Sequence, residues 1–149
     1  MTLEARQRLY VLFWASAGTV VLWRGLPYLG WTSMGDVVGL HGADRWIATA
    51  LGMAFGVVQG VTALRMAGRR AVDRMVAAGP EASPLTLLRP GTVLLVGVMI
   101  GLGLLVRKAP YDPEVKAWVI GILYPGVSLS LYLGCVELLR PRDIEAARG

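Results

Sequence analysis

The chain has 149 residues, a length typical of one domain, and 55% of them are hydrophobic while only 17% are charged. Soluble domains carry about 25% charged residues, so this composition argues against a soluble protein. The net charge of +5 would suit nucleic acid, but the arginines stand between long apolar runs, as expected at the ends of membrane spans, and we predict no nucleic-acid partner.

The first apolar run extends from about Leu9 to Trp23 and predicts a transmembrane helix over about 9–29. The run is shorter than the roughly 20 residues that a span needs, so we expect the helix to continue through Arg24, with its guanidinium reaching the headgroups. The triplet Ala15-Ser16-Ala17 resembles a signal-peptidase site. Too few apolar residues precede it for a signal peptide, and the segment is interpreted as a retained helix.

The second run predicts a transmembrane helix over about 46–66, in which Gln59 is the only strongly polar side chain. Polarity at mid-membrane is costly, so Gln59 is expected to hydrogen-bond a neighbouring helix. The alternative is that it lines a permeation path. Residues 67–89 then form a basic cytoplasmic loop, in which 69–78 could fold as a short helix on the membrane surface.

The third span is predicted over about 90–107, starting at a proline, and the fourth over about 117–139. Pro125-Gly126 stands in the middle of the fourth span. A proline there frees backbone groups that neighbours must satisfy, so we expect a kink that faces other helices. Cys135, the only cysteine, excludes an intrachain disulfide and a CxxC site, and predicts a small buried or lipid-facing side chain.

Together these runs predict an all-α fold, an integral membrane four-helix bundle with both termini inside the cell. The distribution of Lys and Arg sets this orientation, because cytoplasmic segments carry the excess. The N-terminal, central and C-terminal segments hold ten of them, and the two other loops hold five. The ten are Arg6, Arg8, Arg65, Arg69, Arg70, Arg74, Arg89, Arg140, Arg142 and Arg148. A composition rich in Ala, Gly and Arg and poor in Lys suggests a bacterial plasma (inner) membrane.

An internal repeat relates the two halves of the chain. The stretch Leu22-Trp-Arg-Gly-Leu-Pro-Tyr28 recurs as Leu105-Val-Arg-Lys-Ala-Pro-Tyr111, and Trp118 then takes the place of Trp46. The match predicts two tandem helical hairpins related by an axis along the membrane normal. The alternative is chance similarity among apolar segments that end in Arg, Pro and Tyr.

The repeat would place Arg24 and Arg107 opposite each other near the external surface. Two guanidiniums at matched depth could bind an anion, a carboxylate or a lipid phosphate, with the hydroxyls of Tyr28 and Tyr111 nearby. The alternative is that these residues form the outer belt of arginine and aromatic side chains that anchors spans at the interface.

Two further predictions concern packing. Arg65 and Glu137 occupy equivalent places near the cytoplasmic ends of the second and fourth spans, which suggests an ion pair. Glycines four residues apart form the GxxxG pattern that lets helix backbones approach closely, either within the bundle or at a homodimer face. These glycines are Gly52, Gly56 and Gly60 on the second span, and Gly97 and Gly101 on the third.

The sequence offers little chemistry beyond this. Asp36, His41 and Asp44 share the external loop, but one histidine with two aspartates is weak evidence for a metal or acid–base site. No P-loop, H-E-x-x-H or G-x-G-x-x-G pattern occurs. We therefore predict no catalytic, metal or cofactor site and no enzyme activity.

Three classes of function fit this architecture. The first is a small multi-pass protein that acts through helix contacts in the lipid bilayer, as an accessory, assembly or homo-oligomeric subunit with a membrane protein partner or a second copy. The second is a channel or transporter for a small solute, with anions among the candidates, built from the duplicated hairpin. The third is a membrane enzyme acting on lipid, which the missing acid–base residues disfavour.

Overall fold

The computed structural model describes residues 3–33, 35–77, 101 and 103–139. In these parts of the chain the secondary structure is helical, without strands. The elements with defined bounds are α1 (Leu3–Gly25), α2 (Gly42–Gln59), a π-helical turn η1 (Gly60–Leu64), α3 (Arg65–Ala77) and α5 (Pro113–Leu138). The prediction of an all-α chain is therefore confirmed for the residues described.

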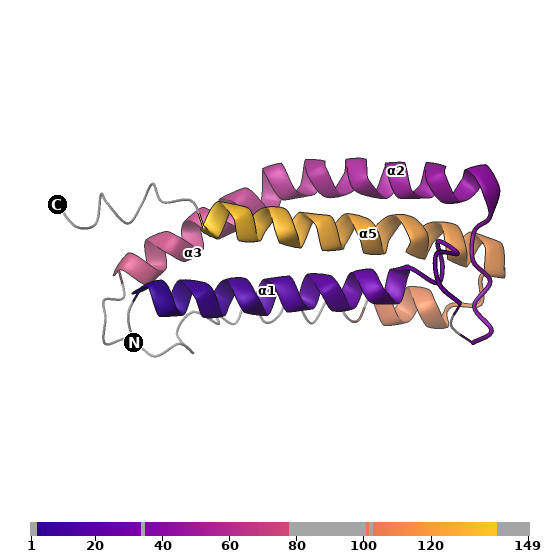
Figure 1. Cartoon of the computed structure of the whole chain (residues 1–149), viewed down its shortest axis with the longest axis horizontal. Coiled ribbons are helices and arrows are strands. Elements are labelled where there is room, and N and C mark those ends of the chain that lie inside the picture. Colours follow the sequence, from indigo (N-terminus) through magenta and orange to yellow (C-terminus); the bar gives the residue numbers. More distant parts are fainter. Residues whose placement is uncertain (1–2, 34, 78–100, 102, 140–149) are drawn as a thin grey trace.

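Helix α5 lies at the centre of these elements. It contacts α1 and α2 along their lengths and also touches η1 and α3. Figure 1 shows α1, α5 and α2 lying side by side along the long axis of the molecule, while α3 continues from α2 and crosses the end of α5 toward the N-terminus. Every other described element therefore shares a contact with α5.

The directions of the helices follow from their contacts. Gly52 of α2 lies against Ile122 and Gly56 lies against Gly126, so α2 and α5 advance together and are parallel. Helix α1 is antiparallel to α5, because the amide of Gln7 donates to the Leu138 carbonyl near one end of the pair, while residues near Gly25 meet Tyr124 near the other.

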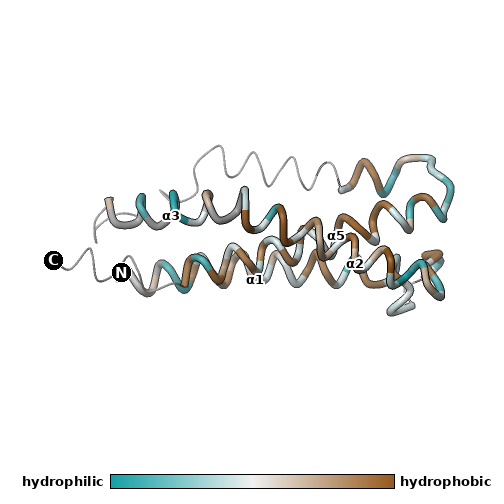
Figure 2. Tube along the Cα trace, turned by 90° about the horizontal axis from the view of Figure 1, so that it is seen from above, coloured by the Kyte–Doolittle hydropathy of each residue, from teal (hydrophilic) through white to brown (hydrophobic). Residues whose placement is uncertain are grey.

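One described helix, α5, is long and apolar enough to cross a membrane. Figure 2 shows the apolar stretches concentrated in the long helices, with hydrophilic residues gathered in α3 and at the opposite, loop-bearing end. Of the predicted spans, 90–107 lies mostly outside the described residues, although 103–108 is helical.

The first helix differs from its predicted range of 9–29. It starts earlier, at Leu3, and ends at Gly25. The chain then turns, with the backbone N–H groups of Tyr28 and Leu29 donating to the Gly25 carbonyl. Pro27 in this turn has no N–H to donate, which explains why the α-helical pattern ends before it.

The second predicted span and the predicted surface helix are joined. Helices α2 and α3 follow each other without a break through η1, so the apolar run 46–66 is divided among three elements and the helix continues to Ala77. The π-helical turn begins at Gly60, whose N–H still donates to the Gly56 and Val57 carbonyls. The described start of the predicted basic loop, residues 67–77, is thus a continuation of the second helix.

Helix α5 begins at Pro113, a favoured first position because a proline lacks the N–H that would have no partner there. It continues as an α-helix through Pro125 to Leu138. Pro125 and Gly126 are both buried, Gly126 against α2 and Pro125 near Gly25 of α1. The expectation that this pair faces other helices agrees with these contacts.

The loop between α1 and α2 folds over one end of the bundle. The Leu40 N–H donates to the Tyr28 carbonyl over 2.9 Å. Gly30 has a φ of +67°, and a Cβ there would lie 2.3 Å from the Leu40 carbonyl oxygen, so only glycine fits. Leu29 and Leu40 are thereby buried against Ala48 and Ala117, with Trp118 and Ile122 packed around them.

Candidate functional site

The contact between α2 and α5 is built from backbone against backbone. A Cβ added at Gly52 would lie 2.7 Å from the Ile122 carbonyl oxygen, and one at Gly56 would lie 2.5 Å from that of Gly126. At Gly60 it would meet Leu133 at 2.7 Å. The structure places the predicted glycine row of the second span against α5, within the chain. Of the row on the third span, Gly97 lies outside the described residues and Gly101 is half-buried.

The contact between α1 and α5 is built instead from polar side chains. The Ser128 hydroxyl donates to the Gly18 carbonyl over 2.8 Å, and the hydroxyls of Thr19 and Tyr132 share a hydrogen bond of 2.7 Å. The Cys135 thiol points at the Val11 carbonyl over 3.6 Å. Near the end of the pair, Gln7 donates to the Leu138 carbonyl.

These α5 residues form one polar stripe. Tyr124, Ser128, Tyr132 and Cys135 follow each other at intervals of about one helical turn, and therefore lie on the same face. The face is the one directed at α1, because three of the four contact α1 through the bonds given above and Tyr124 packs on Gly25. The stripe runs from the C-terminal part of α5 toward the end of the bundle that carries Arg24 and Arg107.

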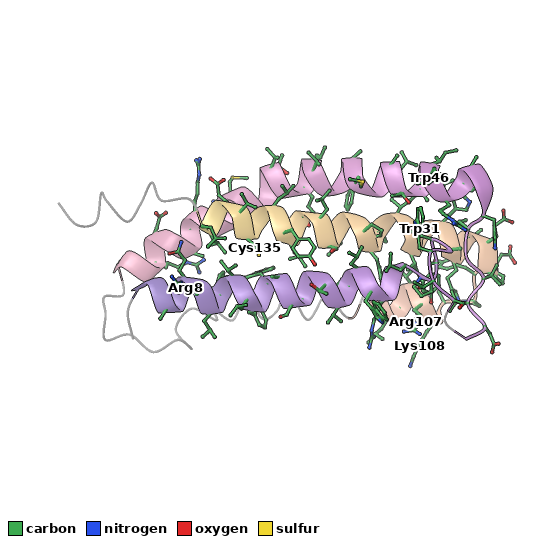
Figure 3. All side chains as sticks on the ribbon, in the orientation of Figure 1. Arg8, Trp31, Trp46, Arg107, Lys108 and Cys135 are labelled. Atoms are coloured by element: carbon green, nitrogen blue, oxygen red, sulfur yellow. The ribbon has the colours of Figure 1, made fainter. Side chains whose placement is uncertain are left out.

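Arg24 and Arg107 both lie at that end of the bundle. Arg24 lies in the last turn of α1, and Arg107 in the last turn of the helical segment 103–108. Both are close enough to the Tyr124 hydroxyl to act on it electrostatically, as is Tyr28. Figure 3 shows Arg107 beside Lys108 where α1 ends, at the opposite end of the molecule from Arg8.

The two predicted tyrosines are placed differently. Tyr28 is buried at 8% exposure, whereas Tyr111 is 55% exposed. The tyrosine that both arginines influence is Tyr124, which the sequence patterns do not single out. The signal that could have found it is its spacing from Ser128 and Tyr132, which continues a polar stripe along a mostly apolar helix.

Gln59 lies at the junction of α2 and η1. Its Oε1 atom is buried and has no hydrogen-bond partner among the described residues. The predicted hydrogen bond to a neighbouring helix is therefore not seen in the described part of the chain. The π-helical turn begins at the next residue, and such turns recur at functional positions in other helices.

Near the other end, Glu137 pairs with an arginine of α3. The Arg69 Nε lies 3.4 Å from a Glu137 carboxylate oxygen, and the Glu137 side chain is only 12% exposed. The Arg65 side chain, the predicted partner, lies outside the part that the structure describes. Gly68 packs beside Glu137, which places this face of α3 against the end of α5.

In the loop between α1 and α2, aromatic side chains pack together while the acidic ones are exposed. Trp31 and Trp46 meet edge to face at 4.9 Å, and the Arg45 guanidinium lies 5.0 Å from the Trp31 ring centroid. The predicted cluster residues, Asp36, His41 and Asp44, are all exposed. Within the described residues no group of three His, Cys, Asp or Glu side chains is placed to hold a metal ion.

In the part of the chain that the structure describes, charges, a hydroxyl and an accessible surface thus meet near Arg24, Arg107 and Tyr124. Guanidiniums and a hydroxyl can donate hydrogen bonds to an oxyanion. No family of known proteins, curated protein or solved structure matches the chain.

Proposed function

We propose that this chain is a multi-pass protein of the bacterial plasma membrane, a four-span bundle with both termini in the cytoplasm, that acts through helix contacts as an accessory, assembly or homo-oligomeric subunit. One observation carries the proposal: α2 is built with its small residues inside and its large apolar residues outside.

The inward face of α2 consists of Ala48, Gly52 and Gly56, all buried. Its outward face exposes large apolar side chains in every turn. These are Trp46, Ile47, Leu51, Met53, Phe55, Val57 and Val58, each at least 42% exposed. A soluble helix would bury such residues and expose polar ones. Surrounded by lipid, the arrangement is favourable, because small residues permit close packing while large ones face acyl chains.

Helix α1 supports the same reading. Leu9, Leu12, Phe13 and Val20 are each about half exposed or more, while the polar contacts of α1 turn toward α5. Exposed Trp23, Trp31 and Trp46 stand near the loop-bearing end, where interfacial tryptophans are expected. The parallel directions of α2 and α5 suit the second helices of two tandem hairpins.

The surfaces of the helices that the chain itself leaves uncovered determine where a partner could bind. The glycine row is covered by α5, so it is not free for a second copy or another protein. The apolar outer faces of α1 and α2 are the surfaces available in the bilayer. A partner helix would dock there in competition with lipid.

The proposed placement of the chain in the membrane is tested by alkaline extraction and by cysteine labelling. In a Cys135→Ser background, Gly35→Cys in the external loop and Ala77→Cys at the end of α3 are expected to react with a membrane-impermeant maleimide from opposite sides of the membrane. The protein should stay in the membrane pellet at alkaline pH. Release at alkaline pH, or labelling of both cysteines from one side, would contradict the proposal.

A second function is favoured by the polar stripe of α5. Tyr124, Ser128 and Tyr132 could line part of a path for a small solute, with Arg24 and Arg107 at its outer end. Flux of small anions into liposomes, compared with protein-free vesicles, tests this. Flux that Tyr132→Phe reduces would raise this function to first place, and flux no greater than in empty vesicles would remove it.

A further inference from the structure

The side chain of Tyr124 passes between two other helices at positions where both carry glycine. A Cβ at Gly25 of α1 would lie 2.7 Å from the Tyr124 Cβ, and a Cβ at Gly103 would lie 3.3 Å from the Tyr124 hydroxyl oxygen. The tyrosine therefore starts beside α1 and ends beside the segment 103–108. It is half-buried, so part of it is accessible from outside the bundle.

Each of the two glycines that Tyr124 contacts has an arginine close by on its own helix. Arg24 is the neighbour of Gly25, and Arg107 follows Gly103 by one helical turn and thus shares its face. Both guanidiniums are exposed and both act electrostatically on Tyr124. Two arginines and a tyrosine from three separate helices consequently lie at the same end of the bundle, near enough for their charges to interact.

Among the described residues, no acidic side chain balances the charge of these arginines. No carboxylate of the described residues lies within ion-pairing distance of either guanidinium, in contrast to Arg69 with Glu137. Two like charges brought together near apolar surface repel, and an anion between them reverses the sign of that interaction.

We propose that Arg24, Arg107 and the Tyr124 hydroxyl form a binding site for a phosphate group. A tetrahedral phosphate carries several acceptor oxygens and can take hydrogen bonds from donors that approach from three directions, while each guanidinium can engage two oxygens at once. The group could belong to a lipid headgroup or to a free phosphate. The site's position at the membrane surface rests on the proposed function, but its chemistry does not.

The test uses the full chain in a phosphate-free maltoside detergent and measures the thermal unfolding temperature. One arm adds sodium phosphate against sodium chloride at equal ionic strength. The other adds mixed micelles of phosphatidylglycerol against diacylglycerol, which has the same tails without the phosphate. A ligand that binds only the folded protein raises the unfolding temperature in proportion to its affinity.

We expect stabilisation by phosphatidylglycerol, by inorganic phosphate or by both, and the arm that responds identifies the source. The double variant Arg24→Gln/Arg107→Gln should weaken the apparent affinity at least about tenfold, as loss of charge-assisted hydrogen bonds predicts. Tyr124→Phe should weaken it by a smaller factor. Lys108→Gln, which removes the adjacent cation, should leave it within about twofold.

Equal stabilisation of the wild type and the double variant would overturn the proposal, as would an equal loss in Lys108→Gln. No response in either arm would overturn it too. A double variant that does not fold is replaced by Arg24→Lys/Arg107→Lys, which keeps the charge but loses bidentate bonding and should still weaken binding. If alkaline extraction released the protein from the membrane but the protein still bound phosphate, the membrane placement would be rejected. The phosphate site would stand.

Discussion

The two sides of α5 are packed by different means. Toward α2, glycines bring backbones so close that an added methyl group would lie 2.5 Å from a carbonyl oxygen, as at Gly56. Toward α1, the close approach is confined to Gly25, where an added methyl group would lie 2.7 Å from the Tyr124 Cβ. Further along, a methyl group added at Gly18 would meet its neighbours at 3.5 Å, an ordinary contact, and side-chain hydrogen bonds join the helices. The first contact depends on shape and the second on a series of separate bonds.

The difference predicts how each contact responds to change. Loss of one hydrogen bond removes only the stability that this bond contributes. Between membrane helices that contribution averages about 0.6 kcal/mol and reaches about 1.7 kcal/mol. Added volume between two backbones has nowhere to go, because neither backbone can turn away as a side chain can. The α2–α5 contact should therefore tolerate less substitution than the α1–α5 contact.

The largest effect is expected for Gly56→Ala. The new methyl group collides with the Gly126 carbonyl, so we expect the free energy of unfolding to fall by about 2–3 kcal/mol, despite the better helix propensity of alanine. Gly18→Ala is the matched change on α1 and should be neutral or stabilise the protein by up to about 1 kcal/mol. Both are measured by reversible unfolding in mixed micelles with sodium dodecyl sulfate. A similar response of the two variants would remove the distinction between the contacts.

How far the sequence predicts these contacts differs between them. The glycine row is visible in the sequence, because a spacing of four residues places Gly52, Gly56 and Gly60 on one helical face. The row predicts a close approach without identifying the partner, since any backbone can fill it. Gly126 completes the contact, but its place beside Pro125 in the sequence predicts only a kink.

The candidate phosphate site was predicted in part. Arg24 and Arg107 were found because the repeated Arg-x-x-Pro-Tyr pattern marks them. Tyr124 lies outside that pattern and reaches the arginines only through the packing of α5 between other helices. Such a contribution depends on tertiary contacts, which neither hydropathy nor repeat matching contains.

The partner of Glu137 illustrates a second limit. Sequence spacing suggested Arg65, whose side chain lies outside the part that the structure describes, and it did not suggest Arg69, one turn further along, which lies within 3.4 Å of the carboxylate. The π-helical turn at Gly60–Leu64 widens the helix just before both arginines and changes the face on which later side chains lie. Regular α-helical spacing cannot anticipate that change.

An intermediate effect is expected for Ser128→Ala. Ser128 is 1% exposed and donates to the Gly18 carbonyl of α1, so its removal should cost about 1 kcal/mol and loosen the α1–α5 contact. Ser130→Ala is the control, because Ser130 is equally buried but bonds to the Val127 carbonyl of its own helix. The same unfolding measurement should show a smaller loss for Ser130→Ala. An equal or larger loss there would mean that the interhelical bond contributes nothing specific.

The smallest effect is expected for the ion pair between Arg69 of α3 and Glu137 of α5. The Arg69 side chain is 56% exposed, and pairs of this kind contribute about 0.2–1 kcal/mol. In a double-mutant cycle, Arg69→Gln and Glu137→Gln should show a coupling energy of about 0.5 kcal/mol that declines with added salt. The parallel cycle with Arg65→Gln and Glu137→Gln tests the pair that the sequence spacing predicts, independently of the Arg69 pair. Absence of coupling between Arg69 and Glu137 at low salt would mean that their ion pair does not stabilise the contact between α3 and α5, which would then depend on the packing of Gly68 against the end of α5.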